Sequence, residues 1–136
     1  MSCSVSTHVL DTAAGRPAAG IAVELLRHDL FAGLPGDGWD LVVSNPPYVR
    51  DDELASLPGD VVDWEPGVAL VDRGQTEALV RDAARALRPG GALVLEAHAH
   101  GAAHVAALLE AQGYADVRVT PDLAGRDRVV EGRAVA

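Results

Sequence analysis

The tetrapeptide Asn45-Pro46-Pro47-Tyr48 is the segment of this sequence best suited to chemistry. It directly follows 39–44, an apolar run with the length of a strand buried on both faces. The Asn45 side-chain amide and the Pro46 carbonyl can each accept a hydrogen from a target NH₂ group, which would orient a nitrogen whose lone pair is delocalised. The two prolines stiffen the turn, and the Tyr48 ring offers a flat face to a planar amide or base. These residues favour a site that orients a planar amide or amine nitrogen.

A proline-rich turn that simply ends the strand is the structural alternative, because proline cannot continue a central ladder. Four residues match by chance often enough that the tetrapeptide alone leaves this alternative open. In an open α/β sheet, ligands bind outside the carboxyl ends of the strands, which is where the tetrapeptide would lie.

Strand and helix patterns alternate along the part of the chain that must position this segment. The strand patterns lie at 21–26, 39–44, 92–97, 114–120 and 128–135. The helix patterns lie at 75–87 and 102–112. Such alternation predicts a mostly parallel α/β sheet. The last two strands are joined by 121–127 without a helix pattern, so we expect that pair to be antiparallel.

Turn residues mark the connections between these elements. Asp51–Gly74 carries several prolines and glycines among polar residues and predicts a long ordered loop, which is uncommon unless functional. Arg88-Pro89-Gly90-Gly91 predicts the end of the first helix, since a basic last turn is followed by proline and glycine. Gly113 is expected to cap the second helix, and Arg126, Asp127 and Arg128 are expected to form a turn with ion pairing.

Composition excludes several classes of protein. The chain has 136 residues, the size of one domain, and 11 basic against 20 acidic residues give a net charge of −9. That charge argues against a broad nucleic-acid-binding face and favours a basic protein partner. Cys3 is the single cysteine, so neither an intrachain disulfide nor a cysteine metal site is possible. We expect a cytoplasmic protein without a signal peptide or a membrane span.

His98, His100 and His104 cluster after a predicted strand, which raises the possibility of a metal site. No cysteine or pair of acids completes a shell of ligands around them. We therefore expect a solvated loop and helix start there, with no metal.

Further segments resemble a known family. They are Asp29-Leu-Phe31, Trp39 to Val49, Glu65-Pro-Gly-Val-Ala-Leu70, Leu87 to Gly91, Leu95-Glu96, Asp122 to Val130, and Gly132-Arg133. Together they resemble the glutamine methyltransferases that modify the Gly-Gly-Gln loop of peptide chain release factors, over about Ile21 to the C-terminus. Asn-Pro-Pro-Tyr alone also occurs in amino-methyltransferases of DNA and RNA, whereas the segments around Glu65 and Asp122 are more specific to the glutamine group.

The resemblance implies a Rossmann-like class I methyltransferase sheet that is mostly parallel with an antiparallel last strand, S-adenosylmethionine as cofactor, and a release factor as protein substrate. It assigns the glutamine pocket to Pro46, Pro47 and Tyr48, and places Asn45 against both substrate and cofactor. Asp29 and Leu30 would bind the cofactor, with Leu30 near the adenine, and Glu65 would brace the loop over the site. Residues 21–136 would be the C-terminal portion of the catalytic domain, and 1–20 a degenerate or remnant segment.

The sequence departs from the family at its N-terminal end. The glycine-rich cofactor loop is not recognisable, and part of the N-terminal half of the sheet has no counterpart. In Val9–Pro17, either Asp11 and Gly15 are remnants of that loop, or Asp11 is the acid that binds the ribose hydroxyls; we favour the second. Without the family's first strand, Leu41 to Ser44 would be an apolar edge, which 21–26 or 4–10 could cover. A nucleic-acid amino-methyltransferase and a non-catalytic remnant are the alternative functions.

Overall fold

The computed structural model of the chain describes residues 9–49, 51 and 67–135. In chain order the elements are strands β1 (Leu10–Asp11) and β2 (Arg16–Pro17), the 3-10 helix η1 (Leu30–Ala32), strand β3 (Trp39–Ser44), helices α2 (Gly67–Leu70) and α3 (Gln75–Ala86), strand β4 (Leu87–Glu96), helix α4 (Ala102–Ala111), and strands β5 (Ala115–Pro121) and β6 (Asp127–Arg133). Both predicted helices are confirmed, as are the strands predicted at 39–44, 92–97, 114–120 and 128–135, with changes at their ends that are largest at the start of β4.

The four longest strands form one mixed sheet in the order β3-β4-β6-β5. β3 and β4 pair in parallel, with Val42 opposite Leu93 and Ser44 opposite Leu95. β6 runs antiparallel to both β4 and β5. Three strands therefore share one direction and the last opposes them, so the α/β class and the antiparallel last strand are confirmed.

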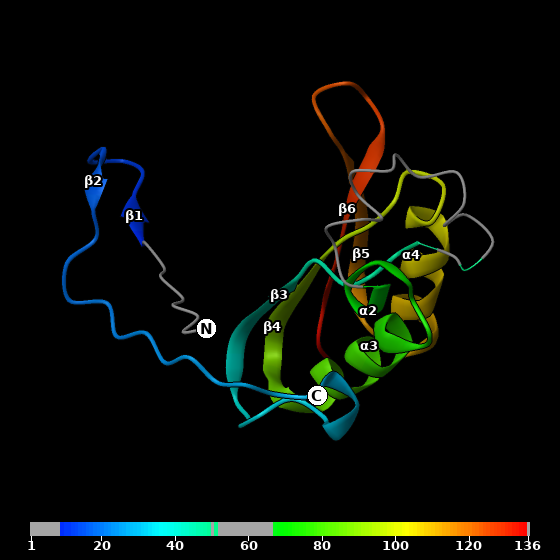
Figure 1. Ribbon diagram of the computed structural model, residues 1–136, viewed down its shortest axis with the longest axis horizontal. Helices are drawn as coiled ribbons and strands as arrows, with labels where there is room; N and C mark the ends of the chain where they lie inside the picture. The colour runs from blue at the N-terminus through cyan, green and yellow to red at the C-terminus, as the bar shows by residue number, and fades with distance from the viewer. Residues whose placement is uncertain (1–8, 50, 52–66, 136) are drawn as a thin grey trace.

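Helices α3 and α4 lie together beside the sheet (Figure 1), and their inward side chains form one buried cluster with those of β4 and β6. The large, fully buried members include Leu79, Leu93, Leu95, Leu109 and Val130. Burying one such side chain contributes roughly 1.5–3 kcal/mol, so this cluster anchors β4 in the middle of the fold. Among the described residues, no helix combines the length and the apolar character needed to cross a bilayer.

The opposite face of β3 is open to solvent. Trp39, Leu41 and Val43 are 48%, 53% and 66% exposed, whereas Val42 packs against the core. Burial of 39–44 on both faces was therefore a wrong prediction, because no described element covers the second face. Among the described residues β3 pairs with β4 alone, which confirms the expected apolar edge.

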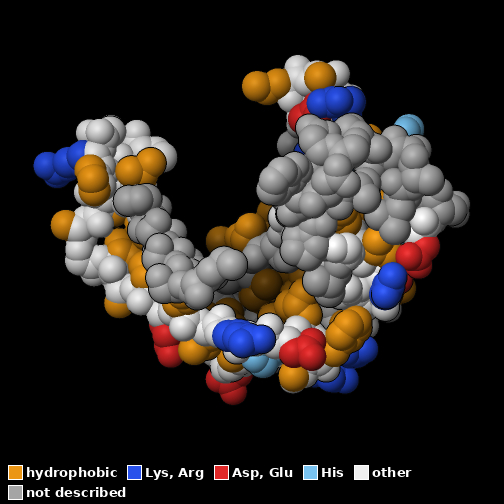
Figure 2. All heavy atoms as spheres, viewed as in Figure 1, with side chains coloured by type: hydrophobic (Ala, Val, Ile, Leu, Met, Phe, Trp, Pro, Cys, Tyr) orange, Lys and Arg blue, Asp and Glu red, His pale blue; other side chains and the backbone are white. Residues whose placement is uncertain are grey.

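Residues 9–29 form an arm that extends away from this body (Figure 1) and carries the antiparallel hairpin of β1 and β2. The strand predicted at Ile21–Leu26 is wrong, since these residues are exposed and have no regular structure. A lone strand is not stable, because its N–H and C=O groups need a partner ladder, and 21–26 does not pair with β3. Figure 2 shows hydrophobic side chains gathered in the hollow between the arm and the body.

Two predicted connections also differ. The loop predicted at Asp51–Gly74 contains helix α2, while its part at 52–66 lies outside the described residues. The helix end predicted at Arg88–Gly91 is confirmed, since α3 ends at Ala86, but these residues form no separate turn because β4 starts at Leu87 and runs through them. Glycine is needed at position 91 for β4 to run this close to β3, because a Cβ there would lie only 2.8 Å from the carbonyl oxygen of Trp39. The close approach of β3 and β4 thus depends on a missing side chain.

The turn between β5 and β6 has the ion pairing expected there, although its acid is Asp122. This carboxylate lies 2.9 Å from the Arg126 guanidinium and 3.9 Å from that of Arg128. A hydrogen bond from the backbone N–H of Arg126 lowers the pKa of Asp122. The turn is therefore held by charge as well as by backbone geometry.

Val43→Lys should reduce self-association of the chain, because a charge on an exposed edge strand opposes edge-to-edge pairing. Val43 is 66% exposed, so the free energy of unfolding should change by less than about 0.5 kcal/mol. Sedimentation velocity over a concentration series would measure the effect. Thr120→Lys, the same charge on β5 at the other edge, is the matched control, and an equal effect of both variants would contradict the assignment to β3.

Tyr114→Phe should change how stability depends on alkaline pH. The buried Tyr114 hydroxyl donates to the Val80 carbonyl oxygen at 2.9 Å, and burial raises its pKa above the ordinary value of 10.0. The folded state keeps the phenol proton where the unfolded chain loses it, so stability is full below pH 10 and falls as pH rises further. The variant should lose about 1 kcal/mol at neutral pH and show a flatter alkaline fall. Urea unfolding at neutral and alkaline pH measures both, and parallel alkaline falls would assign the effect to another group.

Candidate active site

The tetrapeptide lies at the carboxyl end of β3, beside the carboxyl end of β4. Parallel pairing of Ser44 with Leu95 brings the residues after each strand to the same edge of the sheet. Asn45 is exposed and Pro46 is buried. Beyond them Val49 is fixed by an isolated parallel bridge to Val71, and its backbone N–H donates to the Leu70 carbonyl at 2.9 Å. The segment is therefore held at both ends.

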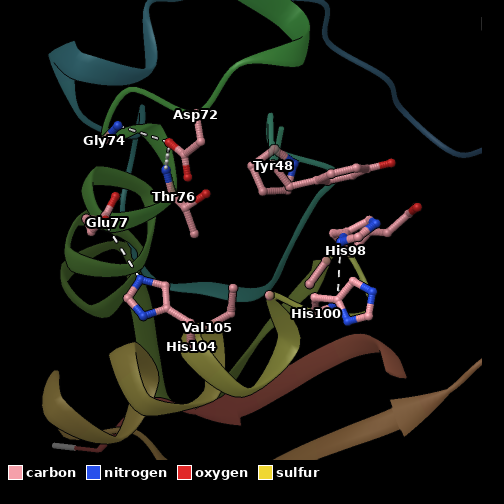
Figure 3. A pocket seen from close by; sticks show the side chains of 13 residues that line it. Tyr48, Asp72, Gly74, Thr76, Glu77, His98, His100, His104 and Val105 are labelled. Atoms are coloured by element: carbon pink, nitrogen blue, oxygen red, sulfur yellow. Dashed lines mark hydrogen bonds and ion pairs between the residues drawn. The ribbon is translucent and has the colours of Figure 1, made fainter. Parts of the chain in front are cut away.

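A first cavity, of about 470 Å³, opens between this segment and the N-terminal ends of α3 and α4 (Figure 3). Its lining includes Pro46, Tyr48, Thr76, Glu96, His98 and Val105. The rings of Tyr48 and His98 stack with centroids 6.2 Å apart and an interplanar angle of 28°. On the other side, His104 Nε2 lies 4.0 Å from a Glu77 carboxylate oxygen. The cavity thus offers flat aromatic faces within a polar, acidic rim.

A second cavity, of about 670 Å³, lies against Pro47. It is lined by Arg27, His28, Asp29, Leu30, Phe31, Pro47 and Gln75. The Asp29 carboxylate accepts the backbone N–H of Phe31 at 3.0 Å, which caps helix η1 and fixes the position of Leu30. This cavity is an open hollow on the surface and is less enclosed than the first.

The two cavities meet opposite sides of the tetrapeptide. Pro46 and Tyr48 line the first, whereas Pro47 between them lines the second. Successive side chains of an extended segment point in opposite directions, which accounts for the alternation. The tetrapeptide therefore lies between the two cavities.

The structure brings some of the predicted site residues together and leaves others apart. Asp29 and Leu30 share the second cavity with Pro47, while Asn45 lines neither cavity. Asp11 lies in the hairpin of the arm, where its carboxylate accepts the backbone N–H of Ala14 at 2.9 Å. Glu65 lies outside the described residues.

Sequence reasoning missed two residues of the first cavity. Asp72 accepts the backbone N–H groups of Gly74, Gln75 and Thr76 at 3.0, 2.9 and 3.3 Å, and so caps the start of α3. An acid just before a helical pattern is the signal that could have identified it. His98 was assigned to a solvated loop, and its contact with Tyr48 depends on the strand register. In the described part of the chain, no three His, Cys, Asp or Glu side chains are grouped so as to hold a metal ion.

Known proteins resemble this chain over nearly its full length. A release factor glutamine methyltransferase from Cereibacter sphaeroides is 45% identical over 97% of this chain and 50% of the relative. Proteins of the same name from Neisseria gonorrhoeae and Deinococcus radiodurans are 35% and 40% identical, over 95% and 85% of this chain and 50% and 42% of their own lengths. No protein-family model matches the chain.

A solved structure of a possible exported protein from Bordetella parapertussis superposes on 81% of this chain and 43% of its own, with a TM-score of 0.51 and 22% identity. That likeness concerns the fold alone.

The relatives place the chain among the methyltransferases by sequence. It belongs to the release factor glutamine methyltransferase family, and it spans about half the length of the curated relatives it matches.

Asp72→Ala should destabilise the chain, because three backbone N–H groups at the start of α3 lose their acceptor. The expected cost is about 0.5–2 kcal/mol, the range for losing a helix cap. Urea unfolding followed by circular dichroism measures it. Asp72→Asn keeps an acceptor oxygen and should recover most of the loss, and an equal loss in both variants would show that charge rather than capping matters.

Proposed function

We propose that this chain takes part in methyl transfer from S-adenosylmethionine to the side-chain amide of a glutamine in a peptide chain release factor. The observation that supports it is the Asn-Pro-Pro-Tyr segment at the carboxyl end of β3, set between two cavities in a chain of this family. The catalytic portion is 21–136, and 1–20 lies outside it.

The first cavity suits the glutamine side chain. Its planar amide would stack on the Tyr48 ring, with the NH₂ group donating to the Pro46 carbonyl oxygen. The Asn45 side chain lines neither cavity, so it would have to turn toward the first cavity to serve as the second acceptor. In-line transfer requires the nitrogen lone pair to face the sulfonium methyl directly, so the substrate amide and the cofactor would have to meet at the edge of the tetrapeptide rather than on its two sides. The cofactor supplies the methyl group on its sulfonium. After transfer the extra proton on nitrogen is strongly acidic and passes to water, so no general base is required.

The second cavity suits one end of the cofactor. Leu30 and Phe31 offer apolar contact for a flat base beside Pro47. The acid that the resemblance assigns to the ribose, Asp11, lines neither cavity. Among the described residues, the fit therefore extends to the adenine end alone. Losing hydrogen-bonding groups that are worth roughly 1–3 kcal/mol each weakens binding by orders of magnitude.

We expect no measurable methyl transfer by the isolated chain at micromolar S-adenosylmethionine. Titration calorimetry with S-adenosylhomocysteine tests the cause directly, because the product should bind the same cavity as the cofactor. Weak or undetectable binding is expected. A dissociation constant in the low micromolar range that Asp11→Ala abolishes would contradict this expectation, and would show that the arm completes the cofactor site.

The reaction itself is tested at millimolar S-adenosylmethionine, where a weak site begins to fill. A release factor should then gain a methyl group on glutamine, detected by peptide mass spectrometry, and Asn45→Ala should abolish it. Methylation of DNA or RNA bases instead would favour a nucleic-acid amino-methyltransferase, which the net charge of −9 argues against. No transfer to any substrate at this concentration would favour a non-catalytic chain, the alternative supported by the position of Asp11.

A further inference from the structure

The rings of Tyr48 and His98 stack at the lining of the first cavity, and the proposed chemistry assigns no step to His98. The two rings come from the ends of neighbouring parallel strands, with centroids 6.2 Å apart. Both residues line the same cavity and are partly buried (Figure 3). The Tyr48 ring that would receive a planar substrate group thus already has an aromatic neighbour.

His98 is itself held in place. Its Nδ1 accepts the backbone N–H of His100 at 3.4 Å. The ring of His100 packs against it at a centroid distance of 5.2 Å, tilted by 57°. A chain of contacts therefore runs from the backbone after β4 through His98 to the ring of Tyr48.

We propose that His98 is a positioning residue that holds the Tyr48 ring in the orientation a planar amide needs for stacking. A tyrosine at the end of an edge strand has two free side-chain torsions, and a stacked neighbour restricts both. A restricted ring loses less entropy when the substrate binds. The contact between the rings stands independently of the reaction, whereas its benefit to a glutamine side chain rests on the proposed function.

The rest of the cavity supplies a matched control. His104 lines the same cavity but faces Glu77 across the N-terminal ends of α3 and α4, at 4.0 Å. Figure 3 shows it on the far side of the cavity from Tyr48. Replacing His104 removes an imidazole from the cavity without removing the stacked neighbour of Tyr48.

Fluorotyrosine labelling and fluorine NMR test the contact. The chain has two tyrosines, so the buried Tyr114 reports on folding while Tyr48 reports on the stack. His98→Ala should move the Tyr48 signal toward that of the free amino acid and leave Tyr114 unchanged. His98→Phe should keep the signal near its wild-type position, and His104→Ala should move neither. If Tyr114 shows that His98→Ala is unfolded, His98→Gln replaces it. An unchanged Tyr48 signal in a folded variant without the ring overturns the proposal.

Titration with N-acetylglutamine amide tests the benefit to substrate. The probe should shift the Tyr48 signal of the wild-type chain, and His98→Ala should raise its dissociation constant roughly two- to tenfold, the range for losing an aromatic contact. His98→Phe should recover the affinity. A His98→Ala chain that binds the probe as tightly as wild type overturns the role of His98. If the Tyr48 signal of the wild-type chain does not shift on titration with the probe, the glutamine function is overturned instead. The Tyr48 signals of the unliganded variants still decide whether the contact between the rings exists.

Discussion

The parallel ladder between β3 and β4 is the interaction on which the rest of this structure depends. It requires a close backbone approach at Gly91, where a Cβ would meet the carbonyl oxygen of Trp39. Parallel neighbours cannot be joined by a tight turn, so the chain must cross over through α3. The same parallel arrangement brings the carboxyl ends of both strands to one edge. Asn45 to Tyr48 and Glu96 to His98 therefore meet there, although they lie some fifty residues apart in the sequence.

The candidate site therefore follows a strand, β3, that packs against the core on one face only. α3 and α4 both contribute to the single core cluster with β4 and β6, so their packing energy falls on one face of the sheet. β3 shares in that core through Val42, while Leu41 and Val43 face solvent. The tetrapeptide that follows β3 is held at its far end by the bridge from Val49 to Val71. The position of the tetrapeptide therefore depends on the ladder between β3 and β4 and on this bridge.

Sequence reasoning succeeded where structure is set by local pattern and failed where it is set by a partner. The helical spacing predicted at 75–87 acts locally, and α3 formed as expected. The apolar run at 39–44 also formed its strand, because β4 supplies its ladder. The run at Ile21–Leu26 has equal strand character, yet it forms none because no described segment pairs with it. Arg88–Gly91 did mark the end of a helix, but the pattern of proline and glycine could not show that a strand would start at once.

The candidate site divides in the same way. Its location at the end of β3 follows from topology, and the sequence predicted it. The separation into two cavities depends on which way each side chain of the tetrapeptide points, and the contact of Tyr48 with His98 depends on the register of two strands. Neither the direction of these side chains nor the register of the two strands can be predicted from a single local sequence pattern. The sequence assigned His98 to a solvated loop, whereas the strand register gives its ring an aromatic partner, Tyr48.

The two cavities beside the tetrapeptide are built on different parts of the chain. The first cavity is built on α3, β4 and α4, elements that the core cluster fixes. The second is built largely on residues 27–31, at the junction of the arm with the body, where capping by Asp29 supplies the local order. The two linings share no described residue, so the shape of the first cavity does not depend on the contacts of the second. Under the proposed function, a planar amide can therefore be recognised beside Tyr48 while affinity for the cofactor is weak.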